Sequence, residues 1–99
     1  MANKLYIDIE TYSSVDLLKA GVYNYCNSID FEILMIAYAL NDEPIQMIDL
    51  AQSEVMPREF IIALTDIQTE KHAHNANFER NCFKAIGMDI PIEQWHCTA

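Results

Sequence analysis

Two acidic segments, far apart in this 99-residue sequence, have residue types and spacings that could do chemistry. Residues 5–11 contain Asp8 and Glu10 at alternate positions, and residues 74–79 end on Glu79. Carboxylate oxygens are the ligands that hard divalent cations such as Mg²⁺ and Mn²⁺ prefer. Such cations activate water and stabilise charge on phosphoryl oxygens. The two segments together predict a divalent-metal site suited to phosphodiester hydrolysis.

The first segment has the alternation of a β-strand. Residues 4–10 place apolar side chains on one face and polar ones on the other. Asp8 and Glu10 then leave the same face with α-carbons ~7 Å apart, so that one ion could contact both. The alternative is an ordinary solvated strand face, because Asp-x-Glu is common by chance.

The second segment has the pattern of a strand followed by a helix. Glu79 falls in the first turn of the expected helix, where the helix dipole favours an acid. From there its carboxylate could turn toward the sheet. The alternative is an ordinary N-terminal helix acid, with Asn75 or Asn77 as the cap.

The rest of the chain predicts the elements that must position these acids. Apolar runs bounded by polar and turn residues predict strands at 31–40, 45–50, 71–75 and 94–98. Helical spacing predicts helices at 57–67 and 76–86, and a short helical turn at 15–20 that Gly21 closes. The expected buried stripes are Phe60, Ala63, Leu64 and Ile67 in the first helix, and Phe78, Cys82, Ala85 and Ile86 in the second.

The order of these elements indicates an α/β fold with a mixed five-stranded sheet. The first three strands would form an antiparallel meander, and the last two would be added in parallel through helices. There is no repeat, low-complexity stretch or linker, so the sequence predicts one domain.

The two acidic segments resemble motifs of the DEDD superfamily of 3′→5′ exonucleases. Asp-Ile-Glu-Thr at 8–11 resembles the first motif, and Asn-Ala-Asn-Phe-Glu at 75–79 resembles the second, usually Asn-x-x-(Tyr/Phe)-Asp. Residues 7–13 and Trp-His-Cys-Thr at 95–98 are most similar to the proofreading domain of phage-type family A DNA polymerases. The resemblance implies a ribonuclease-H-like fold, with residues 1–99 as the N-terminal part of one exonuclease domain whose C-terminal helices are missing.

The resemblance also implies roles for the three acids. Asp8 would bridge two Mg²⁺ or Mn²⁺ ions, Glu10 would hold the ion that activates water, and Glu79 would hold the other. Two cations ~4 Å apart can stabilise both the attacking and the leaving oxygen of the phosphodiester.

Three more residues take substrate roles by the same resemblance. Asn75 and Phe78 would shape a pocket around the 3′-terminal nucleotide, and Thr11 would lie near its 3′ hydroxyl. The implied partners are the 3′ end of single-stranded DNA and the polymerase domain of a parent chain.

The sequence departs from the family pattern in two ways. Glu79 stands where Asp is usual, and its extra methylene shifts the carboxylate by more than ~1 Å, enough to weaken metal positioning. The third motif, Tyr-x-x-x-Asp or His-x-x-x-x-Asp, is absent after the last strand; residues 12–16 fit its spacing but come too early. We therefore expect this piece to be inactive alone. We also expect the missing helices to leave an apolar patch that favours self-association.

The charge balance supports two other hypotheses. Fifteen acids against six bases give a net charge of −9, with no basic cluster to neutralise phosphates. Nucleic-acid contact must then be local and metal-mediated, or be supplied by other sequence. One alternative is a non-catalytic ribonuclease-H-like scaffold or interaction module. The other is a small acidic protein that binds basic partners.

The cysteines and histidines offer weaker alternatives. Three cysteines without paired spacing argue against a disulfide framework and fit a reducing compartment. A zinc site formed by His74, Cys82, His96 and Cys97 has no supporting motif spacing. His72 and His74 could bind a metal from one side of a strand, but an exposed sheet edge explains them more simply. Trp95, Tyr23 and Tyr25 could stack on bases, although core packing is the expected role.

The sequence also bears on location. No apolar run approaches the ~20 residues that span a bilayer, and the N-terminus lacks the features of a secretory signal. We expect no membrane contact and a place in the cytoplasm of a bacterial or phage-infected cell.

Overall fold

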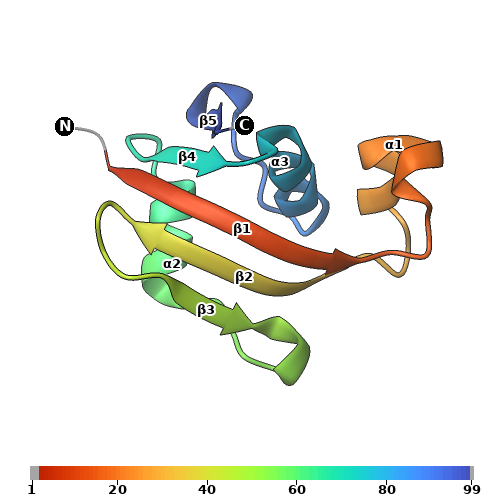
Figure 1. The fold of residues 1–99 in the computed structure, drawn as a ribbon, viewed down its shortest axis with the longest axis horizontal. Coiled ribbons are helices and arrows are strands. Elements are labelled where there is room, and N and C mark those ends of the chain that lie inside the picture. The colour runs from red at the N-terminus through yellow and green to blue at the C-terminus, as the bar shows by residue number, and fades with distance from the viewer. Residues whose placement is uncertain (1–2, 99) are drawn as a thin grey trace.

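The computed structural model describes residues 3–98, which form a mixed five-stranded sheet in the order β3-β2-β1-β4-β5 (Figure 1). The strands are β1 (Lys4–Tyr12), β2 (Glu32–Leu40), β3 (Gln46–Asp49), β4 (Glu70–Ala73) and β5 (Trp95–Cys97). β1, β2 and β3 pair antiparallel, and β4 and β5 are added in parallel. The predicted α/β architecture is confirmed and is consistent with a ribonuclease-H-like fold.

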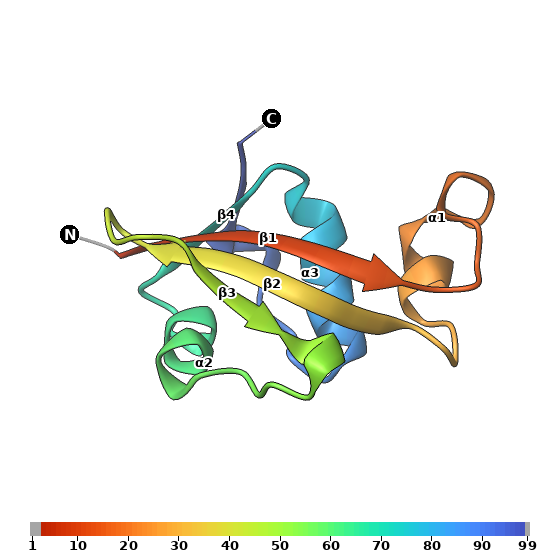
Figure 2. The ribbon, with the colours of Figure 1, turned by 60° about the horizontal axis from the view of Figure 1, so that its bottom comes forward.

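Three α-helices and two short 3₁₀ segments connect the strands. They are α1 (Leu17–Cys26), η1 (Leu50–Gln52), α2 (Arg58–Thr65), α3 (Ala76–Ala85) and η2 (Ile92–Gln94). α2 precedes β4 and α3 precedes β5, so each supplies a crossover between parallel strands (Figure 2). None of the helices within residues 3–98 has the length and apolarity that a membrane span requires.

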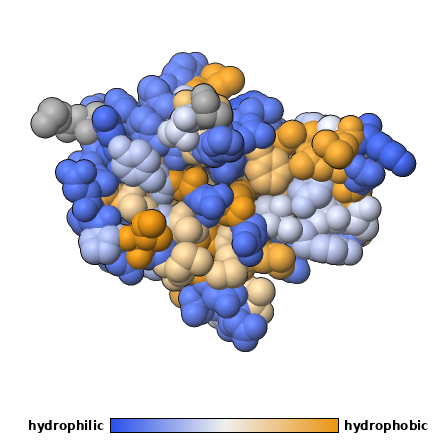
Figure 3. All heavy atoms as spheres, in the orientation of Figure 1, coloured by the Kyte–Doolittle hydropathy of each residue, from blue (hydrophilic) through white to orange (hydrophobic). Residues whose placement is uncertain are grey.

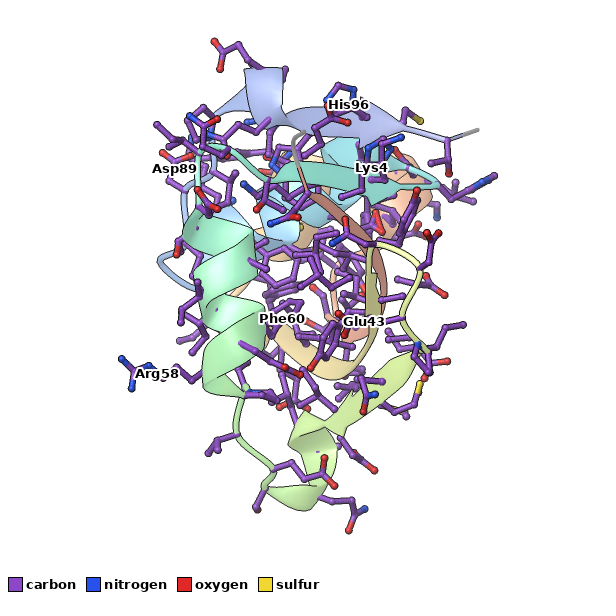
Figure 4. The ribbon with its side chains drawn as sticks, turned by 90° about the vertical axis from the view of Figure 1, so that its left-hand side faces the viewer. Lys4, Glu43, Arg58, Phe60, Asp89 and His96 are labelled. Atoms are coloured by element: carbon purple, nitrogen blue, oxygen red, sulfur yellow. The ribbon has the colours of Figure 1, made fainter. Side chains whose placement is uncertain are left out.

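The core lies between one face of the sheet and the helices α2 and α3. β1 alternates as predicted, with Leu5, Ile7 and Ile9 buried and the intervening side chains exposed. Phe60 points from α2 toward the strands (Figure 4) and is fully buried. A row of rings continues from there, because Tyr38 and Phe83 flank Phe60, at centroid distances of 4.9 and 6.2 Å.

The stripe predicted for α2 is right except at its end. Phe60, Ala63 and Leu64 are buried, but Ile67 lies beyond the helix and is 73% exposed. The helix ends because Asp66 is extended and its carboxylate accepts a hydrogen bond from the Gln68 N–H at 2.9 Å. Such a local turn competes with helix continuation.

The helical turn predicted before Gly21 is only the first half of α1. Gly21 has φ 86° and ψ 166°, a conformation that favours glycine, and joins two helical segments instead of closing one. The second segment packs against α3. α1 otherwise extends away from the sheet, and Figure 3 shows apolar side chains over it, where Leu18 is 96% exposed.

The edge position predicted for the histidines is wrong. β4 lies between β1 and β5, and its His72 ring stacks on His96 of β5 at 4.8 Å. Core packing is confirmed for Trp95, which is 8% exposed, and is wrong for Tyr23, which is 67% exposed.

Candidate metal centre

Asp8 and Glu10 project from the exposed face of the central strand. Asp8 is paired with Ala37 of β2, and Glu10 with Met35. β2 pairs with β1 along this stretch, and the period-two alternation places both carboxylates on one face as predicted.

A bulge interrupts the sheet beside these carboxylates. Glu10 is paired with Met35 but Thr11 is paired with Ile33, so β2 carries one extra residue, Leu34, at this point. Bulges bend a strand and redirect its side chains, and they are frequent next to active sites. The sequence carries no signal for this feature.

Glu79 lies on the buried side of α3. It is 5% exposed and shares this side with Ala76, Cys82 and Phe83. The predicted stripe of α3 is therefore partly wrong, since Phe78 is only half-buried and Ile86 is 41% exposed. Phe78 instead turns toward Tyr25 of α1, with ring centroids 5.9 Å apart.

The environment of Glu79 disfavours its charge. Burial, and secondarily the charge of Asp8, raise the pKa of Glu79 to about 7. Its Oε1 atom is buried and makes no hydrogen bond to any atom of residues 3–98. An acid in such a place is costly unless a cation or a proton neutralises it.

The sheet leaves room for Asp8 and Glu79 to approach each other. β1 pairs with β4 only over Lys4, Leu5 and Tyr6, and then leaves it. α3 starts just past the end of β4 and lies beside β1 (Figure 1). The structure thus places Asp8 close enough to Glu79 for its charge to raise the pKa of Glu79.

No basic side chain among residues 3–98 forms an ion pair with these acids. Within the described part of the chain, the single ion pair joins His72 to Glu70 at 3.0 Å. Carboxylates without a basic partner, and a buried orphan oxygen, fit the oxygen-donor chemistry of Mg²⁺ or Mn²⁺. Residues 3–98 nevertheless contain no cluster of three His, Cys, Asp or Glu side chains placed to hold a metal, so Glu10 does not complete a ready-made site.

A cleft of about 250 Å³ opens on the same face of the sheet beside Asp8. Ala37 and Ala39 on β2 form part of its lining, and Tyr6 and His72 contribute aromatic rings. Asp8 therefore borders a shallow, open hollow of the sheet surface. The small size of the two alanines is a signal that sequence reasoning missed.

The zinc site considered from the sequence is wrong. Cys82 is buried on α3 with its sulfur 3.3 Å from that of Cys26 on α1. Cys97 instead lies on β5, where its thiol donates to the carbonyl oxygen of His74 at 2.9 Å. Burial raises the pKa of both Cys26 and Cys82, so these thiols stay protonated at neutral pH.

Of the three residues predicted to contact substrate, Thr11 lies near the C-terminal end of β1 and Phe78 in the first turn of α3. Thr11 shares a hydrogen bond of 2.9 Å with the hydroxyl of Tyr25, and Phe78 packs against the same tyrosine ring. Asn75 precedes α3, and its carbonyl accepts from the backbone N–H of Phe78 at 2.9 Å. Thr11 and Phe78 converge on one residue, Tyr25, that sequence reasoning did not assign to the site.

The chain is 55% identical over 96 residues to a protein of Bacillus phage SP02 named DNA polymerase. It is homologous to a segment of that protein. The match covers 96% of the chain and 15% of the polymerase, so the chain spans a small part of its relative's length. No family model matches the chain. The segment carrying both acidic motifs is thus related to part of a phage polymerase.

Proposed function

We propose that the chain is part of the 3′→5′ proofreading exonuclease domain of a phage-type family A DNA polymerase. The observation that carries this proposal is the buried carboxylate of Glu79. Its Oε1 atom makes no hydrogen bond within the described residues, and the charge of Asp8 contributes to its raised pKa. The homology to a phage DNA polymerase supports it independently.

In this function the acids would hold two divalent cations, Mg²⁺ or Mn²⁺, at the 3′ end of single-stranded DNA. When bound, the cations supply Lewis acidity and lower the pKa of water. Asp8 would contact both ions, Glu10 the one beside the attacking water, and Glu79 the other. With a pKa of about 7, Glu79 must release a proton before it can ligate a cation.

The substrate side of the site would lie where β1 ends. Thr11, Asn75 and Phe78 would enclose the 3′-terminal nucleotide. Since the chain carries a net charge of −9, most phosphate contacts would come from the polymerase domain of the parent protein or through the metal ions. The protein would act in the cytoplasm of a bacterial or phage-infected cell.

The isolated chain is proposed to be inactive, or nearly so. It offers three acids, and Glu79 carries a longer side chain than the usual Asp. A labelled single strand should keep its 3′ end in the presence of the chain and Mg²⁺. Exposed apolar side chains such as Leu18 and Ile29 on and after α1 would favour self-association of the chain.

A non-catalytic ribonuclease-H-like scaffold is the second candidate function. One observation favours it, namely that residues 3–98 hold no preformed cluster of three metal-ligating side chains. A scaffold would keep the fold and the homology, but would bind divalent cations no better than any acidic surface does. The small acidic protein is the weaker hypothesis, because it leaves the homology to a polymerase unexplained.

A manganese titration of the isotope-labelled chain, followed through its amide NMR signals, tests the metal site. We expect line broadening confined to Asp8, Glu10 and residues 75–79, because these segments share one cation site. The Asp8→Asn chain should need at least ~10-fold more Mn²⁺ to reach the same broadening, as expected when a metal ligand is lost. Asp42→Asn, the same change at an exposed turn residue, should have no effect.

The other outcomes separate the alternatives. Broadening spread evenly over exposed acids would favour the scaffold. Broadening centred on His72, His74 or His96 would mean that the ligands were wrongly assigned.

A further inference from the structure

α1 is docked at the C-terminal end of β1 by two consecutive side chains. Tyr25 shares a hydrogen bond of 2.9 Å with Thr11, and its ring lies 5.9 Å from Phe78. Cys26 follows it, with its sulfur 3.3 Å from that of Cys82. The hydrogen bond to Thr11 reaches the end of β1, and the contacts with Phe78 and Cys82 reach α3.

These contacts join elements that the sheet does not hold together. Thr11 lies just past the bulge at Leu34 of β2, where the register between β1 and β2 shifts. Phe78 lies in the first turn of α3, which follows a strand paired to β1 only near Lys4, Leu5 and Tyr6. The distance between Thr11 and Phe78 is therefore not fixed by strand pairing, and Tyr25 contacts both.

The ring of Tyr25 also packs against a second aromatic ring. It meets Phe31, the residue just before β2, edge-on at 5.9 Å and 72°. A side chain packed against two rings and bonded through its hydroxyl has little freedom, as a positioning group requires.

We infer that Tyr25 is a positioning residue for the nucleotide pocket, which it serves by fixing Thr11 and Phe78 relative to each other. This inference rests on the proposed function. The hydroxyl of Tyr25 orients the Thr11 hydroxyl, and the ring sets the tilt of Phe78. Tyr25 itself need not touch the nucleotide. A pocket whose walls are loosened by even ~1 Å loses much of its selectivity for a bound geometry.

The same helix provides a matched control. Tyr23 is two residues away, and its ring is 67% exposed. Removing a hydroxyl from Tyr23 or from Tyr25 is the same chemical change. The two variants differ in whether that hydroxyl bonds to Thr11.

The test is a titration of the labelled chain, saturated with Mg²⁺, with thymidine 5′-monophosphate as probe. In the wild-type chain we expect shifts of the Thr11 and Phe78 amide signals. Tyr25→Phe should raise the Kd for the nucleotide about fivefold, the effect expected for the loss of one hydrogen bond. Manganese affinity at Asp8 and Glu79 should stay unchanged. Tyr23→Phe should alter neither constant.

Each failure has its own meaning. A wild-type chain that binds no nucleotide overturns the proposed function and this inference with it. A wild-type chain that binds, with Tyr25→Phe binding equally tightly, overturns the inference alone. A parallel loss of nucleotide affinity, manganese affinity and urea stability in Tyr25→Phe also overturns it, because the role of Tyr25 would then be structural only.

Discussion

Replacing Glu79 with Gln is expected to stabilise the metal-free chain at pH 8 by on the order of 3 kcal/mol and to leave it unchanged at pH 4. The pKa of Glu79 is about 7 in the folded chain, against an ordinary value of 4.5. The folded state therefore holds its proton more tightly than the unfolded state does. Its stability falls as pH rises from below 4.5 to above 7, and an uncharged isostere removes that loss. Urea unfolding with a chelator at both pH values measures the difference.

A divalent cation should reverse the order of stability of the wild-type and Glu79→Gln chains at pH 8. If the proposed function is right, a divalent cation would bind the ionised Glu79 at pH 8 and offset its burial, so Mn²⁺ should stabilise the wild-type chain markedly and Glu79→Gln much less. Glu93→Gln, at an exposed position in η2, is the matched control and should follow the wild-type chain at each pH. If Glu79→Gln kept the wild-type pH dependence, the buried carboxylate would not be the group that titrates near pH 7.

The regular elements could be predicted from the sequence because they are encoded locally. The alternation at Lys4–Tyr12 defines β1 and the face of Asp8, whatever packs around it. The spacing of Phe60, Ala63 and Leu64 similarly defines the buried side of α2. The second half of α1 could not be predicted in this way. Its five residues carry too short a pattern, and contacts with α3 hold it.

The site was predictable only in part, because some of its features depend on contacts between distant segments rather than on a local pattern. The carboxylates of β1 follow from period two, but the burial of Glu79 depends on how α3 lies against the sheet. Hydrophobicity selected Phe78 for the buried stripe of α3, whereas the structure buries Glu79 and turns Phe78 toward Tyr25. The bulge at Leu34 and the link through Tyr25 likewise arise from pairing between distant segments. A polar residue in a buried stripe is a local conflict of the kind that marks functional sites.

Replacing Phe60 with Ala is expected to cost the chain about 3–5 kcal/mol of folding free energy. Phe60 is fully buried and lies between Tyr38 and Phe83, and Phe83 in turn stacks on Trp95 at 6.2 Å. These rings join β2, α2, α3 and β5, so a cavity at Phe60 cannot collapse without moving several elements. Since α3 carries Glu79, loosening this core also disturbs the acidic centre. Urea unfolding followed by the fluorescence of Trp95, the single tryptophan, reports the loss directly.

Ile62→Ala is the matched control on the same helix. Ile62 is 55% exposed, so its truncation should cost about 1 kcal/mol or less, partly offset by the higher helix propensity of Ala. A chain of this size is stable by only about 5–15 kcal/mol, so Phe60→Ala should also unfold at much lower urea. Equal effects of the two substitutions would mean that α2 does not pack as described, and that the support of α3 and Glu79 lies elsewhere.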